Sequence, residues 1–126
     1  MYHAHGLLHP ASDFTLDAAE ARLGDRFPGY TVARAGDQIT VSKADWEIAL
    51  LLNTDPGVLA DSANVAERIA GTDDGLDLAR CARRVEVWSD TPDPFVEHLA
   101  DFHAVLDVLR SFTGVVPIDP AEPALM

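Results

Sequence analysis

Residues 30–53, YTVARAGDQITVSKADWEIALLLN, contain three strand patterns joined by two short turns. Apolar and polar residues alternate in the first two segments, residues 30–35 and 38–43, as in strands with one buried face. The third segment, residues 46–53, is apolar on both faces, which is typical of a central strand covered on both sides. Turns as short as Gly36-Asp37 join antiparallel neighbours, so this stretch predicts a three-stranded antiparallel unit.

Strand and helix patterns continue on both sides of this unit. Before it we expect a strand over residues 2–8 and a helix that Thr15 caps and that ends near Gly24. After it we expect a helix over residues 56–69, a short helix from Asp73 to about Cys81, a strand over residues 85–88, a long helix over residues 95–112 and a short edge strand over residues 115–118. The order β-α-β-β-β-α-α-β-α-β predicts an α+β fold, with an antiparallel or mixed sheet of about five to six strands and three to four helices packed on it.

The length of 126 residues suits one domain. We expect a single α+β domain over residues 1–118 and a loose C-terminal tail over residues 119–126, because Pro120 and Pro123 disfavour a strand there. No apolar run approaches the roughly 20 residues that span a bilayer. The N-terminus lacks the pattern of a signal peptide, so we expect a cytoplasmic protein. The single cysteine, Cys81, excludes an internal disulfide and a cysteine-based zinc cage.

Charge restricts the partners that this chain can have. Nine Lys and Arg residues stand against 21 Asp and Glu residues, a formal net charge of −12. Such a field repels phosphate backbones and anionic lipids, so we expect neither nucleic-acid nor membrane binding. It attracts a basic protein, a cationic ligand or a metal ion. The alternative is that the charge serves solubility alone.

Five carboxylates follow one another from the predicted loop after residue 88 down the exposed side of the last helix. They are Asp90, Asp93, Glu97, Asp101 and Asp107. An acidic ridge of this kind raises the encounter rate with a cationic partner. This set is therefore the candidate contact surface for a basic protein. The alternative is an ordinary solvated helix face.

The N-terminal strand offers the only metal-ligating pattern that we find. His3 and His5 point the same way from a strand, and two imidazoles at this spacing can ligate a metal. A catalytic zinc site needs a third protein ligand. His9 lies roughly 13 Å from His5 at the usual rise per residue, too far without a turn, whereas Asp13 could fold back. The hypothesis is a metal-binding protein or metal-assisted hydrolase, and the alternative is a polar strand face.

Other reactive side chains have structural explanations. His98 and His103 each precede an acidic residue by one helical turn, which is typical of a histidine at the edge of a core. Arg80, Arg83 and Arg84 can grip an anion, but pairing with the many carboxylates explains them as well. No glycine-rich phosphate loop follows a predicted strand, and we expect no cofactor. No G-x-S-x-G nucleophile motif occurs either.

Residues 80–120, RCARRVEVWSDTPDPFVEHLADFHAVLDVLRSFTGVVPIDP, combine a strand, an SD-x-PDP-like loop, a long helix and a terminal G-V-V-x-x-D-P strand. This last third of the chain resembles small bacterial α+β proteins, and some proteins of this size and acidity are immunity proteins that neutralise polymorphic toxins. The resemblance implies a non-enzymatic protein-binding module and transfers no functional residue. A homodimer formed through residues 115–118 or the Trp88 face is a further hypothesis.

Overall fold

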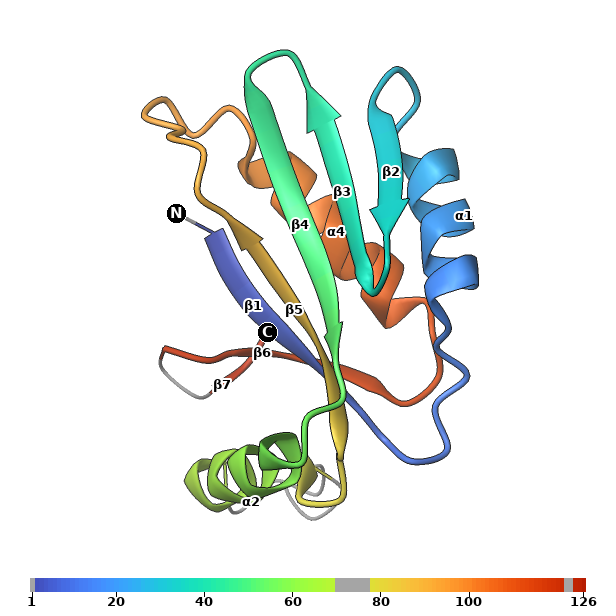
Figure 1. Ribbon diagram of the computed structural model, residues 1–126. Coiled ribbons are helices and arrows are strands. Elements are labelled where there is room, and N and C mark those ends of the chain that lie inside the picture. The colour runs from blue at the N-terminus through green and yellow to red at the C-terminus, as the bar shows by residue number, and fades with distance from the viewer. Residues whose placement is uncertain (1, 70–77, 122–123) are drawn as a thin grey trace.

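The computed structural model describes residues 2–69, 78–121 and 124–126. Within these ranges the chain has an α+β fold built on one seven-stranded sheet, in the order β2-β3-β4-β5-β1-β6-β7 (Figure 1). Every neighbouring pair is antiparallel. The strands are β1 (Tyr2–Leu8), β2 (Thr31–Ala35), β3 (Gln38–Lys43), β4 (Trp46–Asn53), β5 (Arg83–Ser89), β6 (Val115–Asp119) and β7 (Ala124–Leu125), and the helices are α1 (Leu16–Arg26), α2 (Gly57–Arg68) and α4 (Leu99–Arg110).

The predicted three-stranded unit is confirmed. The bounds of β3 and β4 are those expected from the alternation, and β2 begins one residue later than expected. Both turns contain a residue with positive φ, Gly36 at 60° and Ala44 at 53°. The positive φ of Gly36 costs little free energy because glycine has no Cβ, whereas a positive φ at an alanine such as Ala44 is unusual.

Two layers of core lie on opposite faces of the sheet. Alternation along β4 and β5 directs one set of side chains, for example Ile48 and Val87, toward α1 and α4, which lie behind the sheet in Figure 1. Side chains on the opposite face of the sheet include Leu7 of β1 and Ile118 of β6. They form a smaller cluster with residues next to α2. Among the described residues, no helix lies in front of the upper half of β2, β3 and β4. In this part of the chain, α1 and α4 cover one face of the sheet, and α2 packs at one end of the other face.

The C-terminal strands differ from expectation. The segment over residues 115–118 was predicted as an edge strand, but β6 lies between β1 and β7. Residues 119–126 were predicted as a loose tail, whereas Ala124–Leu125 pair with β6 as β7. Both differences have the same cause. Strand partners are set by long-range packing, and prolines next to a short strand do not prevent pairing on its other residues.

The last helix also begins later than predicted. The apolar periodicity predicts a helix over residues 95–112, but α4 starts at Leu99. The carboxylate of Asp93 accepts the backbone N–H groups of Glu97 and His98, and Val96 has a φ of 57°, which no α-helix accommodates. Phe95, which the periodicity places in the core, is 82% exposed.

Two remaining predictions concern the helices. Thr15 caps α1 as expected, because its hydroxyl accepts the N–H of Ala18. The short helix expected from Asp73 falls largely on residues 70–77, which lie outside the described residues. Among the helices that the structure describes, none has both the length and the apolar character needed to cross a membrane.

Candidate functional site

The loop between β5 and α4, residues 90–98, is held in a fixed and strained conformation. Oδ1 of Asp93 accepts the N–H of Glu97 at 3.0 Å, and Oδ2 accepts the N–H of His98 at 2.9 Å. The same Oδ2 accepts the hydroxyl of Tyr2 at 2.5 Å, which ties the loop to β1. These bonds enforce the positive φ of Val96, a β-branched residue for which this region is a genuine outlier. We call this segment the 90–98 loop.

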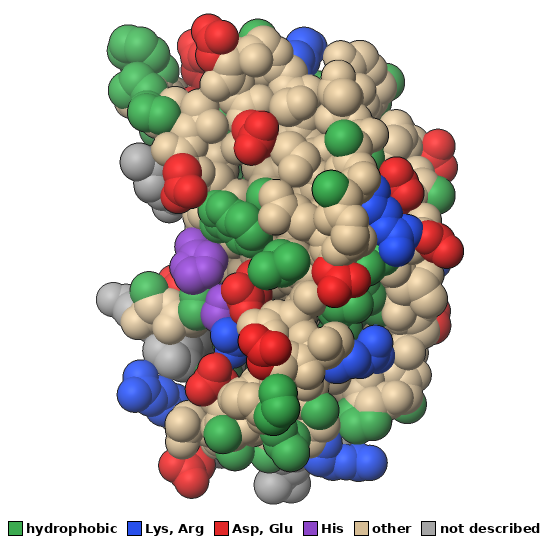
Figure 2. Space-filling view, in the orientation of Figure 1, with side chains coloured by type: hydrophobic (Ala, Val, Ile, Leu, Met, Phe, Trp, Pro, Cys, Tyr) green, Lys and Arg blue, Asp and Glu red, His purple; other side chains and the backbone are tan. Residues whose placement is uncertain are grey.

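The strain presents apolar side chains to solvent. Phe95 is 82% exposed and Val96 is 55% exposed, and Leu99 follows them at the start of α4. In the space-filling view, hydrophobic side chains protrude at the upper left, where the 90–98 loop lies (Figure 2). Single exposed hydrophobes are common, but two on the braced loop and a third at the start of α4 make this surface a candidate interaction site.

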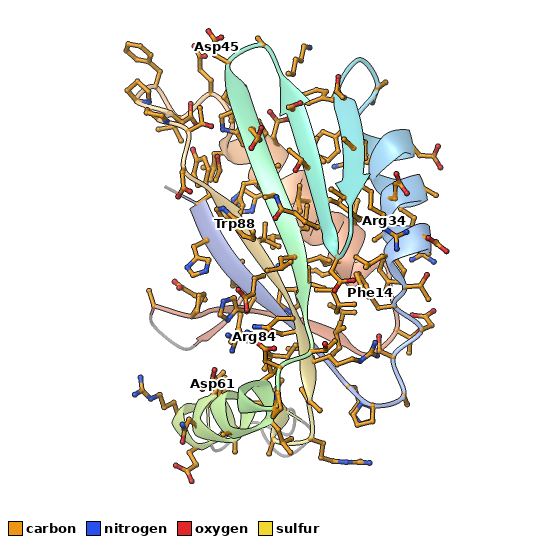
Figure 3. All side chains as sticks on the ribbon, in the orientation of Figure 1. Phe14, Arg34, Asp45, Asp61, Arg84 and Trp88 are labelled. Atoms are coloured by element: carbon orange, nitrogen blue, oxygen red, sulfur yellow. The ribbon has the colours of Figure 1, made fainter. Side chains whose placement is uncertain are left out.

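A cleft of about 410 Å³ lies between the 90–98 loop and the β3–β4 turn. Figure 3 labels Asp45 of that turn, at the same end of the molecule as the loop. The lining residues are Tyr30, Lys43, Ala44, Asp45, Trp46, Thr91, Pro92, Asp93, Pro94, Phe95, Glu97 and His98. The cleft therefore combines aromatic walls with several carboxylates.

One wall of the cleft is a stacked pair of rings. The indole of Trp46 and the imidazole of His98 have centroids 4.5 Å apart and an interplanar angle of 9°. Nδ1 of His98 lies 2.8 Å from Oδ2 of Asp101, and that oxygen also accepts the hydroxyl of Tyr30 at 3.0 Å. Burial, followed by this hydrogen bond, raises the pKa of Tyr30. The predicted partnership of His98 with a carboxylate one turn away is thus present, and it fixes the orientation of the ring.

A carboxylate that orients an imidazole is also part of many acid–base catalysts. A nucleophilic mechanism needs in addition a hydroxyl or thiol bonded to the other ring nitrogen. Among the described residues we find no hydroxyl or thiol bonded to the imidazole of His98. The aromatic rings and carboxylates that line the cleft make it a candidate binding site.

The five carboxylates of the proposed acidic ridge have different environments. Asp93 and Asp101 make the internal bonds described above, and Asp107 pairs with Arg26 at 3.5 Å and Arg110 at 3.4 Å. Although burial raises the pKa of Asp93, hydrogen bonds from Tyr2 and the two N–H groups lower it below its usual value. For Asp90 and Glu97, no side-chain partner is found in the described part of the chain. Figure 2 shows acidic side chains scattered over this face. The ridge is therefore reduced to Asp90 and Glu97, and Asp45 lines the same cleft as Glu97.

His3 and His5 are neighbours on one sheet face, as predicted. Their ring centroids lie 5.0 Å apart in an edge-on contact. Burial and then the positive charge of Arg84 lower the pKa of His5 to about 4. Within the described ranges no group of three or more His, Cys, Asp or Glu side chains could hold a metal ion. The structure thus brings the two predicted ligands together and adds no third, and Asp13 instead accepts the N–H of Thr113.

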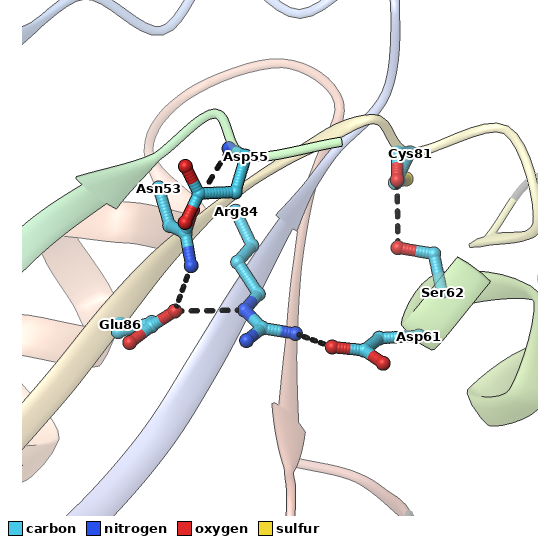
Figure 4. A network of polar contacts seen from close by, with 7 residues as sticks. All are labelled: Asn53, Asp55, Asp61, Ser62, Cys81, Arg84 and Glu86. Atoms are coloured by element: carbon cyan, nitrogen blue, oxygen red, sulfur yellow. Dashed lines mark hydrogen bonds and ion pairs between the residues drawn. The ribbon is translucent and has the colours of Figure 1, made fainter. Parts of the chain in front are cut away.

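Arg84 belongs to a polar network that joins α2 to the sheet (Figure 4). Its Nε and Nη1 donate to Glu86 and Asp61, both at 2.9 Å, and Asn53 donates to Glu86 at 2.6 Å. Burial raises the pKa of Glu86, but the bonds from Asn53 and Arg84 bring it below the usual value. The predicted pairing of arginines with carboxylates is confirmed for Arg84, whose role is structural.

The sequence analysis missed Phe95, Val96, Trp46, Tyr30 and Asp45 as members of one site. Phe95 was assigned to the buried face of the last helix, Val96 to the same helix, and the others to strands or turns. One signal was present in the sequence, since Pro92-Asp93-Pro94 disfavours a helix and Asp is a frequent cap. That signal predicts where the loop ends and the helix begins. It does not predict the hydrogen bond between Asp93 and Tyr2, because Tyr2 lies at the other end of the chain.

Comparison of this chain with family models, curated proteins and solved structures finds no match.

Proposed function

We propose that this protein is a non-enzymatic binding protein, of the immunity or inhibitor kind, that binds a basic protein partner through the 90–98 loop and the adjoining Asp45. The observation that carries the proposal is Phe95, which is 82% exposed on a loop braced by Asp93 and Tyr2. Exposed aromatic side chains on rigid segments are the usual anchors of protein interfaces, because little conformational entropy is lost when they bind.

The strain at Val96 supports the same reading. A positive φ at a β-branched residue destabilises the folded chain by about 1–3 kcal/mol. Such strain persists only where surrounding contacts over-determine it, and it is found most often at functional sites. Here the bracing contacts expose apolar surface to water. The strained conformation therefore favours contact with a partner at the solvent-facing side of the loop over packing in the core.

The charges around the loop support a basic partner. Asp45 and Glu97 are exposed carboxylates that line the cleft together with Phe95, and Asp90 is an exposed carboxylate at the start of the same loop. An apolar centre with a charged rim is the common anatomy of a specific interface. The net charge of −12 adds a long-range field of the same sign. Complementarity therefore favours a basic protein, and rim charges of this kind act mainly on the association rate.

The test measures binding of basic proteins encoded beside the gene for this chain, by calorimetry and stopped-flow kinetics over a salt series. We expect the association rate to fall as salt rises, because screening shortens the range of the acidic field. The double variant Asp90→Asn, Glu97→Gln should bind more slowly and show a weaker salt dependence. For an immunity protein, co-expression should also protect cells from the partner's toxicity.

A matched control removes two carboxylates elsewhere. Asp25→Asn, Glu67→Gln changes the net charge by the same amount at exposed positions of α1 and α2, away from the loop. It should retain most of the association rate. An affinity that is indifferent to salt, or equal losses in the two double variants, would refute binding through this loop.

A further inference from the structure

We infer that the cleft beside the 90–98 loop takes an arginine side chain of the basic partner. This inference rests on the proposed function and names the group that the site recognises. The cleft is lined by three carboxylates, Asp45, Asp93 and Glu97, and by one ammonium, Lys43. The excess of negative charge inside a partly enclosed space favours a cation over a neutral or anionic group.

A cation of the chain itself already uses one wall of the cleft. Nζ of Lys43 lies 4.9 Å from the centroid of the Tyr30 ring, within the range of a cation–π contact. Lys43 is the only lysine in the sequence. The position that its ammonium takes shows that the cleft favours positive charge at this wall. An incoming cation would compete with Lys43 for the ring.

Arginine fits the walls better than lysine does. Phe95 and Tyr30 supply aromatic surfaces, and a planar guanidinium stacks on aromatic rings and is more weakly hydrated than an ammonium. The guanidinium also presents several N–H donors in a planar fork, which suits pairing with carboxylates such as Glu97 and Asp45 of the cleft. The cleft volume of about 410 Å³ leaves room for an arginine side chain without displacement of the 90–98 loop.

The experiment titrates the full chain with N-acetyl-arginine amide, N-acetyl-citrulline amide and N-acetyl-lysine amide, followed by NMR. Citrulline has nearly the shape of arginine without its charge. We expect the arginine compound to shift saturably the signals of the 90–98 loop and of the Trp46 indole. Citrulline should leave them unchanged, and lysine should bind more weakly. Equal shifts with arginine and citrulline, or shifts centred away from the cleft, would overturn the inference.

Two variants sharpen this test. Lys43→Met keeps the aliphatic stem and frees the Tyr30 ring, so it should bind the arginine compound about threefold more tightly. Glu97→Gln should bind it at least threefold more weakly, while Glu67→Gln on α2 serves as the matched control and should not change the affinity. Weaker binding by Lys43→Met, or equal effects of the two glutamine variants, would count against a cation site in this cleft.

The outcome is separable from that of the proposed function. If a basic protein binds in a salt-dependent way through the loop and the arginine compound does not bind, the cleft is not the arginine site and the proposed function stands. If the arginine compound binds in the cleft and no basic protein does, the proposed function fails while the cation site remains.

Discussion

The hydroxyl of Tyr2 donates a hydrogen bond to Oδ2 of Asp93 at 2.5 Å, joining β1 to a loop 91 residues further along the chain. The same carboxylate accepts two backbone N–H groups of the 90–98 loop. Through this one side chain the position of Phe95 depends on the first strand of the sheet. The hydrogen bond also raises the pKa of Tyr2 to about 12.

This bond predicts a loss of stability at high pH. Because the folded chain holds the pKa of Tyr2 near 12 and the ordinary value is 10.0, the contribution is fully present below pH 10 and is lost as the pH rises toward 12. Phenolate absorbance should show one tyrosine that titrates near 12. In Asp93→Asn that titration should move back toward 10, because the charged acceptor is gone. An unchanged titration in Asp93→Asn would show that another group raises the pKa.

The pKa of Asp93 shifts in the opposite direction to that of Tyr2, so its effect on stability is seen at low pH. Its pKa is lowered in the folded chain, so its contribution is present above the ordinary value of 3.8 and is lost as the pH falls through the lowered value. Tyr2→Phe removes the donor and should raise the pKa of Asp93, which the carboxyl carbon signal reports in an NMR titration. The 90–98 loop should then exchange its amide hydrogens faster than in the unaltered chain.

The Arg84 network predicts a coupling to His5. Burial first and then the charge of Arg84 lower the pKa of His5 to about 4. In Arg84→Met the pKa should rise but stay below 6.5, because burial persists. Between pH 6.5 and 4 the unfolded chain binds a proton at His5 that the folded chain does not, so stability falls as the pH falls through this window. Ring-proton NMR titration measures the shift.

The control for this coupling is Arg68→Met. Arg68 lines the same cavity as His5 and Arg84 but does not contribute to the lowered pKa. It should leave the titration of His5 unchanged. Arg84→Met should also lower the free energy of unfolding by about 1–3 kcal/mol, since the largely buried Glu86 keeps only Asn53 as partner. Equal pKa shifts in both variants would show that the effect is not specific to Arg84.

The parts of the fold that the sequence predicted are those with local signals. Alternation over residues 30–53 and two tight turns predict β2, β3 and β4 with little error, because hairpin pairing involves near neighbours in the chain. The central position of β1 between β5 and β6 has no such signal. It depends on which distant strands bury its faces best, which a single sequence does not show.

The candidate site was harder to predict for the same reason. The spacing of Phe95, Leu99 and Phe102 matches a helical stripe, and the pattern by itself predicts that all three are buried. Only Phe102 is buried. The bonds from Asp93 to the N–H groups of Glu97 and His98 keep Phe95 in the loop, and Leu99 is the exposed first residue of α4. The predicted acidic ridge includes carboxylates that pair with neighbouring arginines, such as Asp107. Sequence spacing alone does not distinguish these from unpaired carboxylates.

Two glycines should respond oppositely to alanine. Gly114 has a φ of 74°, and a Cβ there would lie 3.1 Å from the Cα of Ser12 and 3.2 Å from the Cβ of His9. Gly114→Ala should lower the free energy of unfolding by about 1–3 kcal/mol. Gly24 lies in α1 with nothing within 4 Å of the added Cβ, so Gly24→Ala should raise it by about 0.5–1 kcal/mol. Urea denaturation measures both, and destabilisation by Gly24→Ala would contradict the packing of α1.

Val96→Gly separates stability from function. Glycine adopts a φ of 57° without strain, so the substitution should leave the free energy of unfolding unchanged or raise it by about 1 kcal/mol, after the greater freedom of the unfolded chain is counted. At the same time it removes exposed apolar surface and loosens the loop, so binding of the basic partner should weaken. A variant that is both less stable and fully active in binding would show that Val96 serves the fold alone.

Phe95→Ser tests the anchor itself. Because Phe95 is 82% exposed, the substitution should change the free energy of unfolding by no more than about 0.5 kcal/mol, as thermal denaturation will show. Its loss should nevertheless weaken binding of the basic partner by at least about 2 kcal/mol, roughly thirtyfold, which is the behaviour of an interface hot spot. Leu59→Ser, at a residue of α2 that is 47% exposed, is the matched control and should bind normally. Equal binding by the two variants would mean that the exposed ring lies outside the contact surface, and the partner would then have to be sought on another face of the sheet.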